Sequence, residues 1–338
     1  MTEYAIELNN LTKKFGDFTA VDDLSLQVKE GEIFGFLGPN GAGKSTTIRM
    51  LCTLASPTSG KAMVSGYDLI KDSSKVRENI GLVAEKMIMY DNLTAAENLR
   101  FFGKLYNIPK DKLERRIEEL LEMVDMTEWK DTQISKFSTG MKQRINVIRA
   151  LLSEPKIIFM DEPTLGLDPQ TTFSIREIIR DINNEGVTVI LTTHAMTEAE
   201  ALSDRVAIID HGKIVALDTP ENLKNMLSDS DITIFTLKIM NLTSEILESI
   251  NSLDVVTAIA QHDDHHIKIS AKGSDALNQI IDTVRLEGGN IFSIINSNDA
   301  TLEDVFLTVT GKEIRDEPAA KAPPTSHHHG RAPQGRVR

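Results

Sequence analysis

Residues 38–45 read GPNGAGKS and match the spacing G-x-x-x-x-G-K-[ST], which binds phosphate groups. Glycines let the backbone curl so that successive N–H groups face phosphate oxygens, and a helix N-terminus adds positive partial charge. Lys44 is expected to reach the β- and γ-phosphates, and the Ser45 hydroxyl to bind Mg²⁺. The apolar segment 33–37 before the motif supplies the expected strand, which disfavours a chance glycine-rich turn. The predicted nucleotide-binding residues here are Gly38, Pro39, Asn40, Gly41, Ala42, Gly43, Lys44, Ser45 and Thr46.

Two adjacent carboxylates, Asp161 and Glu162, follow the apolar segment 157–160, which reads as a buried strand. Asp161 is placed to hold Mg²⁺, directly or through water, as in other phosphate-loop enzymes. Glu162 is placed to orient and deprotonate an attacking water. The alternative is a pair of solvated turn residues, which the phosphate loop upstream disfavours. The pair therefore favours hydrolysis of a nucleotide over binding alone.

The segment 137–144, FSTGMKQR, lies between the phosphate loop and the acidic pair. By its residues alone it predicts a helix start. In Ser138, Gly140 and its place along the chain it resembles the signature motif of ATP-binding-cassette (ABC) ATPases, whose common form begins Leu-Ser-Gly-Gly-Gln. The first, third and fifth residues depart from that form, as in exporter branches of the family. The resemblance implies that Ser138 and Gly140 grip the γ-phosphate of a nucleotide held by the opposite subunit.

Two further segments resemble motifs of the same family. Residues 165–168, LGLD, resemble the loop that runs along the subunit interface, which implies that Asp168 lies near nucleotide. His194 follows the apolar segment 187–192. A lone histidine is usually structural, but this one resembles the family's switch histidine, which contacts the γ-phosphate. The predicted catalytic residues are therefore Glu162 and His194.

Two weaker matches complete the set. Phe15 resembles the aromatic residue that stacks on adenine; the alternative is an ordinary core phenylalanine. Glu85 stands where the family usually has a glutamine that senses Mg²⁺ and links the site to the membrane subunit. A glutamate can ligate Mg²⁺ but adds negative charge near the phosphates, so this departure leaves the coupling open. The predicted metal ligands are Ser45, Asp161 and Glu85.

Strand-like and helix-like segments alternate up to about residue 227, which favours an α/β domain with a largely parallel central sheet. A capping-box start at Thr94 and an amphipathic run to residue 124 predict a helical subdomain over about residues 92–152. We therefore expect the P-loop NTPase fold of an ABC nucleotide-binding domain over residues 1–227. The strand candidates are Tyr4–Leu8, Ile33–Leu37, Lys61–Val64, Ile157–Met160, Val187–Thr192 and Val206–Ile209.

Residues 228–316 follow a different pattern. Their strand-like and helix-like runs come in the order β-α-β-β-α-β, which predicts a small α+β domain of the ferredoxin-like type. The run 301–306, TLEDVF, begins a last helix and resembles the ATPase subunits of ABC-2-type exporters. Proline, alanine, glycine and basic residues dominate residues 317–338, which predicts a disordered tail.

Composition sets outer limits on the function. The chain has 338 residues and a formal net charge of −13, which disfavours a nucleic-acid partner because phosphate backbones repel an acidic surface. Its single cysteine, Cys52, allows no intrachain disulfide and is expected to pack as a small apolar residue. No apolar run is long enough to span a bilayer, and the N-terminus does not resemble a secretory signal.

The family resemblance implies the ATP-hydrolysing subunit of an ABC exporter, similar to multidrug, daunorubicin-resistance and sodium-export ATPase subunits. Two copies are expected to close head to tail on two ATP–Mg²⁺ and to drive a separate integral membrane permease. Such a subunit is cytoplasmic and peripheral on the cytoplasmic face of the cell membrane. Two alternatives stay open at this point: a soluble ABC ATPase without a transporter, and a non-catalytic module that binds ATP for regulation.

Overall fold

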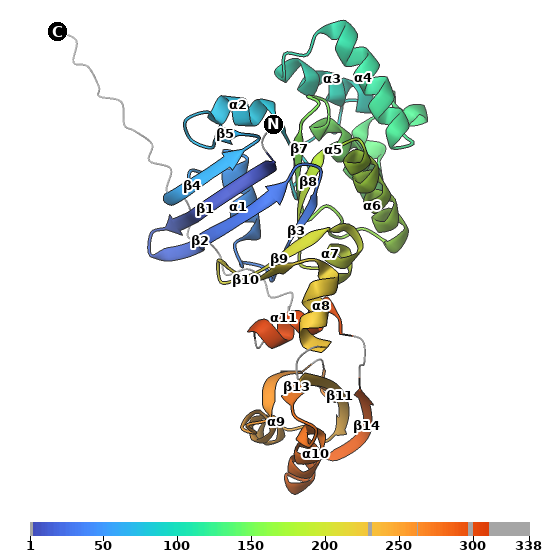
Figure 1. Ribbon diagram of the computed structural model, residues 1–338. Helices are drawn as coiled ribbons and strands as arrows, with labels where there is room; N and C mark the ends of the chain where they lie inside the picture. Colours follow the sequence, from blue (N-terminus) through green and yellow to red (C-terminus); the bar gives the residue numbers. More distant parts are fainter. Residues whose placement is uncertain (1–2, 229–231, 262, 297–299, 311–338) are drawn as a thin grey trace, which may run out of the picture.

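The computed structural model describes residues 3–228, 232–261, 263–296 and 300–310 of the chain. These residues form three sheets with helices packed between and around them (Figure 1). Two sheets and their helices make up the upper body in Figure 1, and the third sheet lies below it. The predicted tail, residues 317–338, lies outside the described residues.

A six-stranded sheet in the order β10-β9-β3-β8-β7-β6 forms the centre of the upper body. Its strands pair in parallel except for β10, so the prediction of a largely parallel central sheet is confirmed. Ile157 and Phe159 of β7 pack into one core and Ile158 and Met160 into another, so both faces of the sheet are buried. The strands are β3 (Ile33–Leu37), β6 (Ile80–Val83), β7 (Ile157–Asp161), β8 (Thr188–Thr193), β9 (Arg205–Asp210) and β10 (Lys213–Asp218).

A second, antiparallel sheet in the order β2-β1-β4-β5 lies beside the central one. The sequence predicted two of its strands, Tyr4–Leu8, which was too short, and Lys61–Val64, but did not predict that they belong to a separate antiparallel sheet. Register shifts interrupt β1 after Leu8, and Asn10 has a left-handed backbone with φ 51°. The strict alternation of side chains is therefore lost although the strand continues. The strands are β1 (Tyr4–Phe15), β2 (Phe18–Lys29), β4 (Ser59–Val64) and β5 (Tyr67–Asp68).

Helix α1 (Lys44–Leu51) packs between the two sheets. Its Ile48 and Leu51 share one core with Ile6 of β1 and Phe34 of β3. Cys52, directly after α1, is buried and free, as the sequence predicted. The short α2 (Ser73–Glu78) adds Val76 to the same core. This core fixes α1 against the end of β3.

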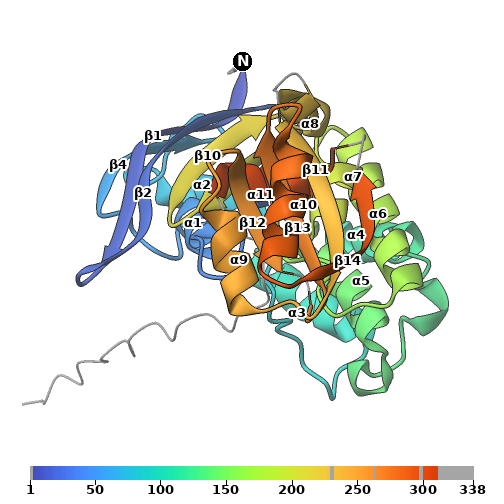
Figure 2. The same cartoon turned by 90° about the horizontal axis from the view of Figure 1, so that it is seen from below.

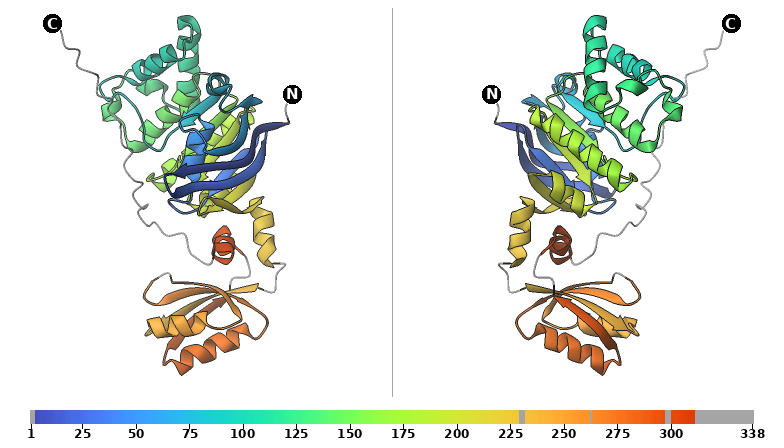
Figure 3. Two further views of the ribbon diagram at one scale, coloured as in Figure 1. Left: turned by 90° about the vertical axis from the view of Figure 1, so that its left-hand side faces the viewer. Right: turned by 90° about the vertical axis from the view of Figure 1, so that its right-hand side faces the viewer.

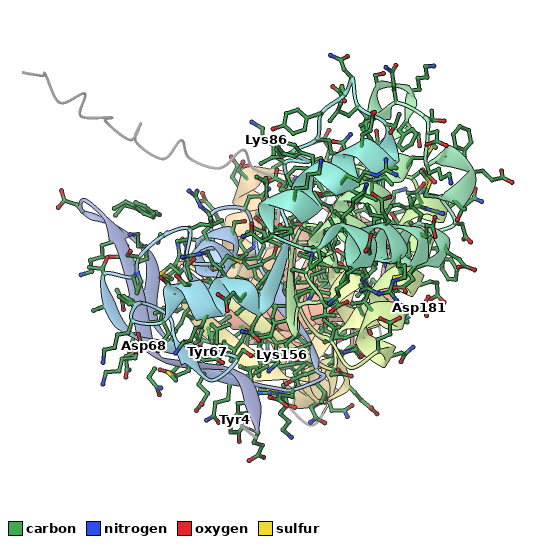
Figure 4. The ribbon with its side chains drawn as sticks, turned by 90° about the horizontal axis from the view of Figure 1, so that it is seen from above. Tyr4, Tyr67, Asp68, Lys86, Lys156 and Asp181 are labelled. Atoms are coloured by element: carbon green, nitrogen blue, oxygen red, sulfur yellow. The ribbon has the colours of Figure 1, made fainter. Side chains whose placement is uncertain are left out.

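Four helices cover the other face of the central sheet: α3 (Ala95–Leu105), α4 (Lys110–Met123), α5 (Thr139–Ala150) and α6 (Pro169–Asn184). Short 3₁₀ turns at Thr127–Trp129 and Ile134–Lys136 connect α4 to α5. The capping box predicted at Thr94 is present, with reciprocal bonds between Thr94 and Glu97. From above, Lys86 lies beside the turquoise helical subdomain, while Tyr67 and Asp181 lie on opposite sides of the body (Figure 4).

The third sheet has the strand order β12-β13-β11-β14, with antiparallel pairing throughout. With its two helices it follows the β-α-β-β-α-β order, so the ferredoxin-like prediction is confirmed. Helices α9 and α10 cover one face and lie in front when the molecule is seen from below (Figure 2). The elements are β11 (Ile232–Met240), α9 (Ser244–Asn251), β12 (Val256–Gln261), β13 (His266–Lys272), α10 (Ala276–Leu286) and β14 (Asn290–Asn296).

Three helices join this sheet to the upper body: α7 (Met196–Leu202), α8 (Pro220–Ser228) and α11 (Leu302–Thr310). Figure 3 shows α11 between the upper body and the lower sheet. Phe306 and Val305 of α11 share a core with Leu37 and Ala199, whereas Leu307 packs on β12. The last helix therefore belongs to the junction between the two predicted domains, whose boundary at residue 227 stays a prediction. Among the described residues, none of the helices has the length and apolar character needed to cross a bilayer.

Candidate active site

The phosphate loop joins the buried strand β3 to the first residue of α1. At two positions of this loop, any residue with a Cβ atom would clash with the neighbouring backbone. A Cβ on Gly38 would lie 2.2 Å from the Ile209 carbonyl oxygen. Gly43 has φ 108°, and a Cβ there would lie 2.4 Å from the Ala20 carbonyl oxygen. The loop is therefore held tightly by its neighbours, with the N-terminus of α1 directed at the space where an anion binds.

Lys44 is 4% exposed, and its side chain folds back over the loop. The Nζ atom donates to the carbonyl oxygens of Gly38 at 2.6 Å and Pro39 at 3.2 Å. It also lies 3.4 Å from Glu162 Oε1. Burial lowers the pKa of Lys44, and the neighbouring Glu162 opposes that shift. The ammonium thus lies among three oxygens at the position where the motif binds phosphate oxygens.

Three oxygen groups meet beside the loop. Ser45 Oγ donates to Asp161 Oδ1 at 2.9 Å, and Thr192 Oγ1 donates to the same oxygen at 2.6 Å. Hydroxyl and carboxylate oxygens are the ligands that Mg²⁺ prefers, usually together with substrate phosphates and water. The described residues hold no group of three or more His, Cys, Asp or Glu side chains arranged for a metal. The Ser45 and Asp161 oxygens therefore suit the predicted Mg²⁺ ligands, and this role stays a prediction.

Glu162 and His194 are in direct contact. His194 Nδ1 lies 2.9 Å from Glu162 Oε2, so the carboxylate is placed between this ring and Lys44. Glu162 has a left-handed backbone with φ 51°, which costs about 1–3 kcal/mol for a residue other than glycine. Its N–H donates to Thr192 Oγ1 at 3.1 Å, which helps to hold this conformation. The predicted base is thus one of the described residues with a strained backbone.

The central sheet explains why residues so distant in sequence meet. Leu37 pairs with Thr193, and Asp161 pairs with Thr192, in the parallel ladders of β3, β8 and β7. The phosphate loop, the acidic pair and His194 all follow the carboxyl ends of these strands. In an open α/β sheet this edge is the usual place for a ligand.

The signature segment and the interface loop lie against each other. Ser138 is the N-cap of α5 and accepts from the Met141 N–H at 3.2 Å. A Cβ on Gly140 would lie 2.5 Å from the Thr171 side chain of α6. Asp168 caps α6, and hydrogen bonds from Thr171 lower its pKa. Within the described part of the chain, the hydrogen bonds of Ser138 do not join it to Lys44 or Glu162.

The two weaker predictions lie at the surface. The Phe15 ring is 41% exposed, with Lys13 Nζ 4.9 Å from its centroid, so the alternative of a core phenylalanine is wrong. Stacking on adenine stays a prediction. Glu85 is exposed and follows β6, whose Val83 pairs with Met160 of β7. It therefore lies at the same edge of the sheet as Asp161, and its role as a ligand also stays a prediction.

Three residues around the site were not predicted from the sequence. Thr192 holds Asp161, Gln143 Nε2 donates to the Pro163 carbonyl oxygen at 2.7 Å, and the buried Glu198 accepts from a threonine side chain. The sequence could have marked Thr192 as a site residue, because it is a polar residue near the end of the strand that leads to His194. Gln143 and Glu198 read as ordinary polar residues of helices, since their burial depends on distant parts of the chain.

Comparisons with known proteins identify the family. A family model described as "ABC transporter" matches residues 21–165. The linearmycin resistance ATP-binding protein LnrL of Bacillus subtilis (strain 168) is 38% identical over 313 residues, which cover 92% of this chain and 100% of that protein. The chain belongs to the ATP-binding proteins of ABC transporters. The predicted resemblance and the predicted fold class are confirmed.

A further relative is also an ATP-binding protein for drug resistance, and a solved ATP-binding subunit is similar in fold. The daunorubicin resistance ATP-binding protein DrrA2 of Streptomyces coeruleorubidus is 34% identical, over 95% of this chain and 100% of that protein. A solved ATP-binding subunit of an ABC transporter is 29% identical, with a TM-score of 0.60, over 66% of this chain and 93% of that one.

A second solved structure bears on the activity. It is a dimeric ATP-binding cassette in a post-hydrolysis state with ADP and Pi, and it is 28% identical, with a TM-score of 0.57. The match covers 63% of this chain and 98% of the solved cassette. The ABC protein described here binds ATP and is an ATPase, so the predicted activity is confirmed.

Proposed function

We propose that this ABC ATPase is the energy-supplying subunit of an exporter. Two copies close head to tail on two ATP–Mg²⁺ and drive a separate integral membrane permease from the cytoplasmic face of the membrane. The observation that carries the proposal is the Glu162 carboxylate, 3.4 Å from Lys44 Nζ and 2.9 Å from His194 Nδ1, beside the Ser45–Asp161 oxygens. This arrangement supports hydrolysis and goes beyond what nucleotide binding alone requires.

Each residue then has a chemical role. Lys44 and the amides of the loop bind the β- and γ-phosphates, and Ser45 and Asp161 hold Mg²⁺. Bound Mg²⁺ neutralises charge that develops on the transferred phosphoryl group. Glu162 orients the attacking water and accepts its proton, and His194 holds the carboxylate and contacts the γ-phosphate. The strained Glu162 backbone keeps the carboxylate directed at the attacking water.

The position of the signature segment favours a composite site. Ser138 caps α5 and Gly140 in its first turn lies against Thr171 of α6, whereas the described bonds of Ser138 do not involve the Lys44–Glu162 pair of the same chain. A second copy placed head to tail brings its Ser138 hydroxyl and the N-terminus of its α5 to the γ-phosphate. Asp168, which caps α6 next to Gly140, then lies along the same interface.

An exposed apolar patch on the helical subdomain is suited to a permease. Tyr90 and Phe101 stack edge to face at 4.7 Å between centroids, and Leu105 follows Phe101 by one helical turn. They are 47%, 36% and 62% exposed, respectively. Such grouped apolar surface marks a protein contact. We assign it to a cytoplasmic segment of the permease, because two relatives that this chain matches over their full length are ATP-binding proteins for drug resistance.

The proposed base is tested by Glu162→Gln. Hydrolysis should fall by about 10²–10⁴-fold, since the base is lost, while binding of a fluorescent ATP analogue changes little. Gel filtration with ATP should show a trapped dimer. The control Glu200→Gln makes the same chemical change on the exposed face of α7 and should behave as the wild type. Turnover of Glu162→Gln near the wild-type rate would refute the assignment.

The composite site is tested by mixing two inactive variants. Ser138→Arg blocks the signature half of each site, and Lys44→Ala disables the phosphate-loop half. The mixed dimer contains one site in which both halves are intact, so mixing should restore part of the activity. Full activity of Ser138→Arg alone would exclude the head-to-tail arrangement.

The permease contact is tested by Phe101→Glu combined with Leu105→Glu. Export in cells should be lost, while the isolated ATPase keeps its turnover, because the patch is separate from the Lys44–Glu162 site. Leu286→Glu on α10, where the side chain is 86% exposed, is the matched control. Unchanged export by the double variant would show that this patch is not the contact with the permease.

A further inference from the structure

Glu198 is a buried carboxylate that the proposed chemistry does not use. It lies on α7, four residues after His194, and is 1% exposed. Burial raises its pKa, as expected for a carboxylate that loses water. A buried acid is retained only where its oxygens have partners. Its partners therefore indicate what it does.

Both partners are threonines adjacent to the predicted catalytic residues. Thr164 Oγ1 donates to Glu198 Oε1 at 2.6 Å, and Thr164 follows Glu162 by two residues. The Thr193 side chain also hydrogen-bonds to the Glu198 carboxylate, and Thr193 directly precedes His194. The other charged groups that act on Glu198 are Arg176 of α6 and Glu162 itself. One carboxylate thus joins the chain segments that carry the base and the histidine.

The segment after Glu162 is held from two sides. On one side the Pro163 carbonyl oxygen accepts from Gln143 of α5. On the other side Thr164 is bound by Glu198 of α7. Glu162 has left-handed backbone geometry, which persists only where surrounding contacts determine it. Loss of either contact frees the segment to relax away from that geometry.

We propose that Glu198 is a positioning residue: its carboxylate fixes the 163–167 segment to the end of β8, so that Glu162 and His194 keep their mutual orientation during hydrolysis. This inference rests on the proposed role of Glu162 as the base. Glu198 touches neither the nucleotide nor the reacting atoms in this account. Its removal should therefore lower kcat and leave ATP affinity nearly unchanged.

The first test uses Thr164, where a matched pair of substitutions exists. Thr164→Val keeps the shape and removes the donor, and Thr164→Ser keeps the donor. In the full chain, kcat of Thr164→Val should fall about 10- to 100-fold, the range for one hydrogen bond to a charged group. Thr164→Ser should stay within about twofold, and both should bind a fluorescent ATP analogue like the wild type. Equal kcat values for the two variants would overturn the inference.

The second test changes Glu198 itself. Glu198→Ala should lower kcat like Thr164→Val, whereas Glu198→Gln, which keeps an acceptor oxygen, should recover most of the activity. The double variant Thr164→Val/Glu198→Ala should be no slower than Glu198→Ala, because Glu198→Ala already removes the contact that Thr164→Val removes. Glu200→Ala on the same helix is the control, since its carboxylate is exposed. A loss of ATP affinity in place of kcat, or additive losses in the double variant, would overturn the inference.

The variant Glu162→Gln distinguishes a failure of the positioning role of Glu198 from a failure of the proposed role of Glu162 as the base. If Glu162→Gln loses hydrolysis and Thr164→Val and Glu198→Ala keep the wild-type kcat, the positioning role is wrong and the proposed base stands. If Glu162→Gln keeps its turnover, the proposed base is wrong, and the positioning role fails with it.

Discussion

The described residues include a buried lysine–carboxylate pair in the ABC cassette and another in the C-terminal part. In the ABC cassette, Lys44 Nζ lies 3.4 Å from Glu162 Oε1 and also donates to two carbonyl oxygens of its own loop. In the C-terminal part, Lys268 Nζ of β13 lies 2.5 Å from Asp304 Oδ1 of α11. The other Asp304 oxygen accepts from the Thr301 N–H and hydroxyl at 2.8 and 2.7 Å. Both pairs are largely removed from water, but their surroundings differ.

The difference distinguishes a ligand-binding site from a structural contact between the C-terminal part and the upper body. We call this contact, formed by Lys268 and Asp304, the joint. The oxygens around Lys44 belong to a strained glutamate and to a loop that binds phosphate, so an incoming phosphate can replace them. Asp304 has its partners within the C-terminal part itself, and α11 places it between β13 and the upper body. The first pair should therefore control binding and turnover, and the second pair should control stability.

The largest expected effect is that of Lys44→Ala on nucleotide binding. The substitution removes charge-assisted hydrogen bonds to phosphate, each worth about 1.5–3 kcal/mol, so affinity should fall by about 100-fold or more. Equilibrium binding of a fluorescent ATP analogue measures the effect. Lys104→Ala, at an exposed lysine of α3, is the control. Unchanged affinity in Lys44→Ala would remove the distinction between the two pairs.

The next effect is that of Lys268→Met on stability. This change leaves Asp304, which is 1% exposed, without its cation, and breaking a buried pair costs about 3–5 kcal/mol. The free energy of unfolding in urea should fall by that amount, while ATP affinity stays close to that of the wild type. Reduced ATP affinity at unchanged stability would contradict the assignment of this pair to a joint.

Two matched variants sharpen the result. In Lys268→Met/Asp304→Asn both charges are removed and an amide oxygen can still accept from Thr301, so stability should return most of the way to the wild-type value. Glu303→Gln removes a carboxylate 3.9 Å from Lys268 that is 42% exposed, so it should change stability by less than about 1 kcal/mol. A double variant that is as unstable as Lys268→Met would show that the pair itself stabilises the joint.

The parts of the fold that follow contiguous patterns were predictable. The strand before the phosphate loop, the Thr94 capping box and the β-α-β-β-α-β order all depend on neighbouring residues. The antiparallel sheet was missed because β1 is irregular after Leu8 and its partners are set by distant strands. The place of α11 was also not predicted, since its core is shared with Leu37 and Ala199, more than a hundred residues away.

The same division holds for the active site. Lys44, Asp161, Glu162 and His194 were found because a motif or a strand end marks each of them, and the structure brings them together. Glu198 was not found, because the sequence of α7 gives its carboxylate no feature that differs from an exposed one. Only the packing of α7 against the segment after Glu162 distinguishes it. Positioning residues of this kind depend on tertiary contacts that a single sequence does not record.

The smallest expected effect concerns Glu198 and pH. Burial raises the folded-state pKa of Glu198 above its ordinary value of 4.5, so the folded state binds this proton more tightly than the unfolded state. The resulting stabilisation is fully present below pH 4.5 and is lost as pH rises through the folded-state pKa.

The variant Glu198→Gln has no carboxyl proton at this position. The Tm of Glu198→Gln minus that of the wild type should therefore rise with pH above 4.5 and then level off. Scanning fluorimetry of both proteins without nucleotide measures this difference, in which titrations common to both proteins largely cancel. A difference that is constant with pH, or that falls as pH rises, would show that Glu198 is not held as a buried acid.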